Sequence, residues 1–190
     1  AGVFEKLTAR PLPQILSDQA ERFGAQGVAI REKAYGIWQT FTWQDYFHYV
    51  KLTGLGLLAL KIRRGDTVGI ITNNHAEWLF SELGAQAVGG VTLNLFTSAI
   101  AEELAASLAR TQATFAIVQD QEQVDKLLEK RESLSHIKKV IYVDPTGMRN
   151  YRIDPWLMSF RELLRTGEEL DKSEPELFGQ ELARGRSRDT

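Results

Sequence analysis

The chain has 190 residues, of which 43% are hydrophobic and 25% are charged, and its formal net charge is −2. These values fit one soluble globular domain and exclude a disordered or strongly basic protein, so nucleic acid is not an expected partner. The absence of cysteine excludes disulfides, thiolate catalysis and thiolate metal sites. The first residues lack the apolar core of a signal peptide, and the longest apolar run is too short to cross a bilayer. We therefore expect a cytoplasmic protein that makes at most a peripheral membrane contact.

A packing helix and a hairpin are predicted at the start of the chain. Pro11 and Pro13 introduce the helix, and Gly24 ends it, because glycine readily adopts the left-handed backbone that closes a helix. The β-prone runs 28–32 and 37–41 are separated by a short turn, which predicts an antiparallel hairpin.

A long helix is predicted to follow the hairpin. Thr42, with Asp45 three residues later, has the pattern of a capping box, and an apolar stripe follows it. Arg63 and Arg64 are expected in the last turn of this helix, where positive side chains suit the helix dipole, and Gly65 is expected to close it.

Two glycines in the middle of this long helix, Gly54 and Gly56, have the spacing of a dinucleotide-binding fingerprint. That fingerprint must follow a strand and open a helix, whereas these glycines lie within an apolar helical stripe. We therefore interpret them as positions where helices pack closely.

Residues 64–144 are predicted to form a βαβαβαβ core. Four β-prone apolar runs recur every 23 to 25 residues, with amphipathic helices between them, and Asn74, Ser98 and Asp120 are the expected helix caps. This rhythm is typical of a doubly wound, mostly parallel α/β sheet, whose ligands gather at the carboxyl ends of the strands. The predicted strands are 67–72, 91–95, 114–118 and 139–143.

Residues 145–190 lose this rhythm and are predicted to form an irregular, helical extension. A short amphipathic helix is expected over 156–165, ended by Gly167, and a last helix is expected over 177–183. The acidic stretch 168–176 between them is expected to be exposed.

The residues after the first predicted core strand have two interpretations. Asn73, Asn74, Glu77 and Trp78 could face a ligand at the strand end, but a helix cap and an aromatic packing residue explain them better. The three histidines lie far apart in the sequence without other ligands nearby, so they are expected at surface or capping positions and no metal site is expected. They are His48, His75 and His136.

The residues after the second core strand are the candidate binding site. Phe96, Thr97 and Ser98 precede a predicted helix, so an exposed aromatic ring beside free helix amides could stack a base and hold a phosphate. A buried phenylalanine followed by an ordinary helix cap explains the same residues equally well.

Two runs, Arg64–Trp78 (RGDTVGIITNNHAEW) and Gly89–Phe96 (GGVTLNLF), closely resemble the front part of the AMP-forming acyl-CoA synthetases. Further runs, in the same order and spacing, most resemble the long-chain fatty-acid branch of that family, and the resemblance covers nearly the whole chain. The supporting runs are 41–43, 115–128, 138–142 and 159–164.

The resemblance implies that this chain is the amino-terminal portion of an ATP-dependent, AMP-forming long-chain fatty-acid–CoA ligase. In such an enzyme a fatty-acid carboxylate attacks the α-phosphate of ATP held with Mg²⁺, and the thiol of coenzyme A then takes the acyl group from the adenylate. The phosphate loop of the family is expected just after Arg188–Thr190, and the Mg-binding acid and the catalytic lysine lie further on. The chain alone is therefore expected to be inactive, to hold no catalytic or metal-binding residue, and to bind none of these cofactors.

In such synthetases the loop that matches Phe96, Thr97 and Ser98 approaches the nucleotide end of coenzyme A, although the family has glycines where Thr97 and Ser98 stand. The resemblance thus implies a coenzyme A contact at these three residues. It also implies that the remainder of the synthetase is the main partner, and that all three regions are parts of one truncated domain. These regions are 1–63, 64–144 and 145–190.

Alternative interpretations remain open at this stage. The chain could be a free-standing flavodoxin-like module that binds a nucleotide or a protein partner at its strand ends, or part of another adenylate-forming enzyme. It could also serve mainly as a contact surface, in a homodimer or at a membrane.

Overall fold

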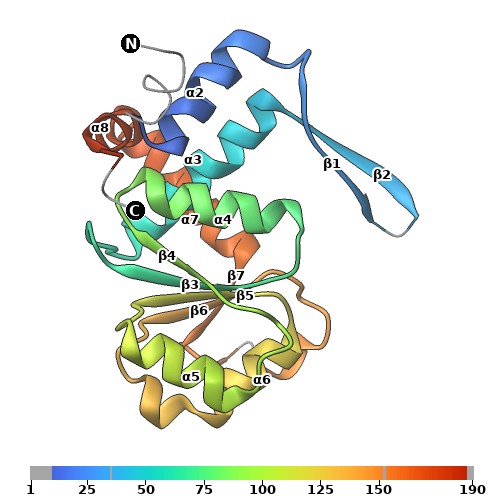
Figure 1. Ribbon diagram of the computed structural model, residues 1–190, viewed down its shortest axis with the longest axis vertical. Helices are drawn as coiled ribbons and strands as arrows, with labels where there is room; N and C mark the ends of the chain where they lie inside the picture. Colours follow the sequence, from blue (N-terminus) through green and yellow to red (C-terminus); the bar gives the residue numbers. More distant parts are fainter. Residues whose placement is uncertain (1–9, 35, 152, 188–190) are drawn as a thin grey trace.

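The computed structural model describes residues 10–34, 36–151 and 153–187 and has an α/β fold with a separate hairpin (Figure 1). Its sheet has five parallel strands in the order β4-β3-β5-β6-β7, and helices cover both faces. The predicted doubly wound, parallel fold with an amino-terminal hairpin is confirmed. The strands are β3 (Thr67–Ile71), β4 (Val91–Asn94), β5 (Phe115–Val118), β6 (Lys139–Tyr142) and β7 (Leu157–Ser159).

The fifth strand corrects a prediction from the sequence. Residues 156–165 were expected to form one helix, whereas β7 occupies Leu157–Ser159 and pairs with β6 before a helix begins at Phe160. A three-residue strand is too short to show a period of two, and only its pairing with the distant β6 defines it.

The helices form two layers, one on each face of the sheet (Figure 1). Each layer buries its own cluster of apolar side chains, among them Phe80 and Leu163 on one face and Leu104 and Leu127 on the other. The first layer contains α2 (Leu12–Phe23), α3 (Trp43–Ala59), α4 (Ala76–Ala87), α7 (Phe160–Ser173) and α8 (Leu177–Arg184). The second contains α5 (Ala101–Arg110), α6 (Gln121–Glu129) and the short 3-10 helix η1 (Arg131–Leu134), and a second 3-10 helix, η2 (Met148–Tyr151), follows β6.

Glycines allow α3 to approach α7 so closely that the two backbones touch. A Cβ atom added to Gly56 would lie 2.4 Å from the carbonyl oxygen of Leu163, and one added to Gly167 would lie 2.1 Å from that of Leu52. The interpretation of the α3 glycines as packing positions is therefore confirmed. The predicted helix end at Gly167 is wrong, because α7 continues to Ser173 and uses this glycine for the close contact.

The predicted caps are correct at two helices. Thr42 Oγ1 accepts a hydrogen bond from Asp45 N at 3.1 Å, and the Asp45 carboxylate accepts one from Thr42 N at 2.9 Å, which completes the capping box of α3. Asp120 accepts a hydrogen bond from the backbone of Gln123 at the start of α6, at 3.3 Å.

Other predicted helix ends are wrong. The helix α3 ends at Ala59, and the left-handed backbone of Lys61, with φ of 65°, turns the chain before Arg63 and Arg64 are reached. Ser98 does not cap α5, because the N-cap position is Ile100, two residues later.

Asn74 does not cap α4 either, because a side chain from the hairpin takes that place. The helix begins after His75, and the first helical amide, Ala76 N, donates a hydrogen bond to Glu32 Oε2 at 2.9 Å. Since Glu32 lies 44 residues earlier in the chain, no local capping pattern could indicate this contact.

The hairpin consists of β1 (Val28–Ala34) and β2 (Ile37–Thr42), which pair with each other in antiparallel register, as predicted. It projects to one side of the layer that contains α2, α3 and α4 (Figure 1). Its base is packed on the first layer of helices through Ile30 and Phe41, while residues 37–40 are exposed.

Candidate functional site

The side of the sheet on which the next strand is added changes between β3 and β5, at the carboxyl ends of these strands. From β3 the chain crosses through α4 to the edge strand β4, whereas from β5 it crosses through α6 to β6 on the other side. In such sheets this change of side opens a crevice that commonly binds ligands. Here Asn73 N, just after β3, donates a hydrogen bond to Gln119 Oε1, just after β5, at 3.1 Å.

The loop after β4 lies beside this crevice and contains the three candidate site residues. Phe96 is 82% exposed, so the alternative of a buried phenylalanine is wrong. Thr97 Oγ1 lies 3.0 Å from Asn73 Oδ1, where it donates a hydrogen bond, and Ser98 is exposed. The structure thus joins Thr97 to the loop after β3 and leaves the ring of Phe96 and the hydroxyl of Ser98 facing solvent.

A lysine from α6 holds the same loop, and the sequence analysis did not single it out. Lys126 Nζ donates a hydrogen bond to the carbonyl oxygen of Thr97 at 2.8 Å and pairs with Glu122 Oε1 at 2.8 Å. The hydrogen bond from Lys126 lowers the pKa of the Glu122 carboxyl below its ordinary value. In the sequence the relevant signal is that α6 follows β5, a neighbour of β3 in the sheet. This signal does not single out Lys126.

The other four candidates lie in the loop after β3 and at the start of α4, and they have structural contacts or exposed side chains. They are Asn73, Asn74, Glu77 and Trp78. Trp78 Nε1 donates a hydrogen bond to Asn94 Oδ1 at 3.1 Å, so the tryptophan bridges α4 and the end of β4. Asn74 is exposed and Glu77 is half-buried in the first turn of α4. The interpretation of Trp78 as a packing residue therefore agrees with its contacts.

Besides the crevice, a pocket of about 330 Å³ lies at the carboxyl ends of β6 and β7. Tyr151 Oη donates a hydrogen bond to Asp125 at 2.7 Å, and this bond raises the pKa of the phenol, which keeps it protonated. The carboxylate of Glu162 accepts hydrogen bonds from Ser159 N and Oγ, both at 2.8 Å, and these hydrogen bonds, the backbone one first, lower its pKa. Asp125 and Glu162 are therefore both occupied by structural hydrogen bonds. The pocket is lined by Tyr142, Pro145, Tyr151, Leu157, Ser159 and Glu162.

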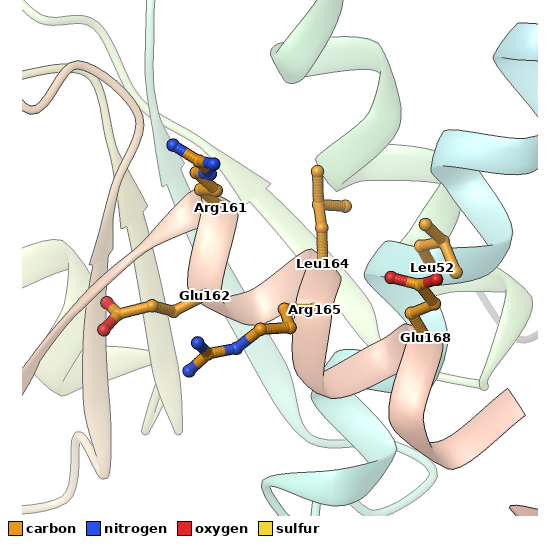
Figure 2. A pocket seen from close by; sticks show the side chains of 6 residues that line it. All are labelled: Leu52, Arg161, Glu162, Leu164, Arg165 and Glu168. Carbon is orange, nitrogen blue, oxygen red and sulfur yellow. The ribbon is translucent and has the colours of Figure 1, made fainter. Parts of the chain in front are cut away.

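Another pocket, of about 450 Å³, lies along α7, and Figure 2 shows its lining side chains. Charged side chains of both signs project from α7, and Leu52 of α3 lies beside Glu168. It contains none of the candidate site residues. The lining residues are Leu52, Arg161, Glu162, Leu164, Arg165 and Glu168.

The described part of the chain contains no group of three or more His, Asp or Glu side chains that could hold a metal ion. His75 Nδ1 lies 3.6 Å from Glu32 Oε2, and His136 Nε2 lies 3.2 Å from the carbonyl oxygen of Leu108. His48 is exposed. The histidines therefore occupy surface and helix-end positions. No helix among the residues that the structure describes combines the length and apolar content needed to cross a bilayer.

Residues 16–175 match the family described as "AMP-binding enzyme". The chain belongs to this family. Curated relatives include the long-chain-fatty-acid–CoA ligase ACSBG2 of Xenopus laevis, 25% identical over 162 residues, which make up 85% of this chain and 21% of the relative. Another is the long-chain-fatty-acid–CoA ligase heimdall of Drosophila melanogaster, 34% identical over 133 residues, or 68% of this chain and 20% of the relative. The chain thus spans about a fifth of the length of these AMP-binding enzymes.

Solved structures of proteins named as ligases share the fold of this chain. A mutant form of coronafacic acid ligase from Pectobacterium brasiliense has a TM-score of 0.71 at 14% identity, covering 80% of this chain and 29% of that chain. A long-chain-fatty-acid CoA ligase from Rhodopseudomonas palustris, so named provisionally, has a TM-score of 0.66 at 19% identity, covering 83% and 37%. At these identities the likeness concerns the fold, which agrees with the resemblance seen in the sequence.

Proposed function

We propose that this chain is the amino-terminal part of an AMP-forming long-chain fatty-acid–CoA ligase. In the first step a carboxylate oxygen of the fatty acid attacks the α-phosphorus of ATP, and pyrophosphate leaves. In the second step the sulfur of coenzyme A attacks the acyl carbonyl carbon, and AMP leaves with the bonding electron pair. The observation that carries this proposal is the family match over residues 16–175, supported by relatives whose names specify long-chain fatty acids.

Within this ligase, we assign Phe96, Thr97 and Ser98 to the approach of the nucleotide end of coenzyme A. The exposed ring of Phe96 offers a surface on which an adenine base can stack, at a strand end where ligands of parallel sheets gather. The hydrogen bonds of Thr97 to Asn73 and of Lys126 to the Thr97 carbonyl hold this loop in place, so the ring is presented by a fixed backbone.

The charge-stabilising groups for the adenylation step belong, in this proposal, to other parts of the ligase. ATP, Mg²⁺ and coenzyme A are the proposed cofactors of the whole enzyme, and Mg²⁺ when bound would neutralise charge on the phosphates. Because these charge-stabilising groups lie elsewhere in the proposed ligase, we expect this chain alone to lack ligase activity. A cytoplasmic location is also part of the proposal, and the remaining ligase polypeptide is the proposed main partner.

The assignment of Phe96 is tested in the full-length ligase by substitution with alanine. Loss of one base-stacking contact, worth about 1 to 3 kcal/mol, should raise KM for coenzyme A about fivefold or more. The KM for ATP should stay unchanged. Ile100→Ala is the matched control, since Ile100 is another exposed apolar side chain, at the end of the same loop, and is 56% exposed. An equal effect of Phe96→Ala on both KM values would refute a specific coenzyme A contact.

A second candidate function is a free-standing flavodoxin-like binding module. The observed strand order, β4-β3-β5-β6-β7, is the order of that fold, with the crevice at the ends of β3 and β5. Calorimetric titration of the 190-residue chain with ATP separates the two candidates. Tight ATP binding by this chain would favour the module, whereas acyl-CoA formation by the longer protein, from a long-chain fatty acid, ATP and coenzyme A, would favour the ligase.

A further inference from the structure

The hairpin β1–β2 carries apolar side chains that the described residues leave uncovered. Ile37 and Trp38 are each 65% exposed, and Val28 is 46% exposed. The whole stretch 37–40 of β2 is exposed, and it lies in the part of the hairpin that projects farthest from the body (Figure 1). Several large apolar side chains gathered on one projecting element are a common mark of an interaction surface.

The hairpin is nevertheless held firmly against the body. The ring of Phe41 lies 5.5 Å from that of Phe80 and 6.0 Å from that of Tyr49, both in edge-to-face geometry. The carboxylate of Glu32 accepts the hydrogen bond from Ala76 N at the start of α4. These contacts fix the direction in which the hairpin projects, so a partner would meet a preformed surface.

The hairpin also has free backbone edges. Among the described residues β1 and β2 pair only with each other, so the outer edge of each strand is left without a strand partner. An isolated two-stranded hairpin is only marginally stable in water, and an unpaired edge readily accepts an additional strand. Since residues 37–40 are all exposed, the edge of β2 is open to such an addition.

The charge on one face of the hairpin indicates the chemistry of the occupant. Lys33 pairs across the strands with Trp38, and Arg31 pairs with Thr40, so the two basic side chains lie on the same face. Both are exposed, and neither forms an ion pair with another described residue. Acidic side chains on the occupant would complement this face.

We propose that the β2 edge pairs with a β-strand from the remainder of the polypeptide, and that this strand carries acidic side chains on the face of the hairpin where Arg31 and Lys33 lie. This inference rests on the proposed function, in which the chain is one part of a ligase. The two curated fatty-acid–CoA ligases named above are about three and a half to four times as long as this chain, which leaves ample polypeptide to supply the strand. A second copy of the chain fits less well, because it would add two more basic side chains to the surface and no acidic partner for them.

Amide hydrogen exchange compares the 190-residue chain with the longer protein. We expect the amides of residues 37–40 that point away from β1 to exchange at least tenfold more slowly in the longer protein, because a paired strand edge is protected. The amides of β5, which is fully buried, are the control and should exchange slowly in both proteins. Equally fast exchange of residues 37–40 in both proteins would overturn the proposal.

Two further exchange measurements distinguish the proposed strand from a second copy of the chain and from a lipid surface. Protection of residues 37–40 that increases with the concentration of the 190-residue chain would identify a second copy and overturn the proposal. Protection of the longer protein that appears only with vesicles of phosphatidylserine and phosphatidylcholine would identify a lipid surface and also overturn it.

Charge reversal tests the chemistry of the occupant. The double substitution Arg31→Glu and Lys33→Glu in the longer protein should accelerate exchange at residues 37–40 at least threefold, whereas Arg110→Glu on the exposed surface of α5 should not. Unchanged exchange in the double variant would refute the acidic partner. Acyl-CoA formation is assayed separately, so protected β2 amides in a protein without ligase activity would refute the proposed function and leave the strand pairing intact.

Discussion

The contact between α3 and α7 and the hairpin β1–β2 represent opposite extremes of packing in this fold. Between the helices, glycines bring backbone against backbone, and Leu163 is fully buried. On the hairpin, Trp38 keeps 65% of its surface in solvent. The comparison indicates that α3 and α7 satisfy each other's packing, whereas the hairpin contacts the body through Phe41 and Glu32 and leaves Trp38 in solvent.

The largest effect should come from filling the α3–α7 contact. Gly167→Ala places a Cβ atom 2.1 Å from the Leu52 carbonyl oxygen, so the two helices must separate. We expect a loss of about 3 kcal/mol in the free energy of unfolding, measured by urea denaturation. Gly179→Ala in α8 is the matched control, because nothing lies within 4 Å of its Cβ position. A Gly167→Ala protein as stable as this control would show that the helices do not need their close approach.

A smaller loss is expected at the attached end of the hairpin. Phe41→Ala removes a half-buried ring that contacts Tyr49 and Phe80, and the free energy of unfolding should fall by about 2 kcal/mol. Ile37→Ala, at the open end of β2, should change it by less than about 0.5 kcal/mol. Equal losses from the two substitutions would contradict the division of the hairpin into an attached and an open end.

The junction between the hairpin and α3 should respond to pH. Hydrogen bonds from Thr42, the side-chain bond first and then the backbone bond, lower the pKa of Asp45 below its ordinary value. The stability that Asp45 contributes is therefore complete above the ordinary carboxyl pKa and is lost as pH falls through the lowered pKa. Asp45→Asn should cost about 1 kcal/mol at neutral pH, and its difference from the unmodified chain should shrink in acid.

Urea denaturation at neutral and at acidic pH measures this difference. Glu132→Gln, at an exposed position, is the control and should leave the pH dependence as it was. A gap between Asp45→Asn and the unmodified chain that stays constant into acid would exclude the charge of Asp45 as its cause.

The smallest effect is expected from Trp38→Ala in the 190-residue chain. Because Trp38 is largely exposed, the free energy of unfolding should change by less than about 0.5 kcal/mol. A loss above about 1 kcal/mol would show that the ring already packs on this chain. The same substitution in the longer protein should cost more, since the proposed added strand would cover the ring.

Local patterns in the sequence were sufficient to predict most of the fold. The four core strands carry β-branched apolar runs, and the capping box of Thr42 and Asp45 involves residues three positions apart, so each signal is contained within a few residues. The family resemblance depends on the order of such runs along the chain and agrees with the match over residues 16–175.

Features that depend on distant residues were not predictable in this way. Strand β7 exists through its pairing with β6, the start of α4 is capped by Glu32 of the hairpin, and Lys126 reaches the Thr97 carbonyl from another helix. At the candidate site the sequence identified the loop of Phe96 but not its exposure, which depends on how the loops after β3 and β4 are joined. In each case the missing information was a tertiary contact.

The position of α7 has a consequence for synthesis on the ribosome. The helix that lies against α3 is made more than a hundred residues after it, so α3 must wait, with its glycine-lined surface uncovered, until Gly167 has left the exit tunnel. Long waiting times between contacting segments slow folding and leave apolar surface open to other chains. A nascent chain halted before α7 is made should therefore be a preferred substrate for chaperones, whereas one halted after Ser173 has left the exit tunnel should be released.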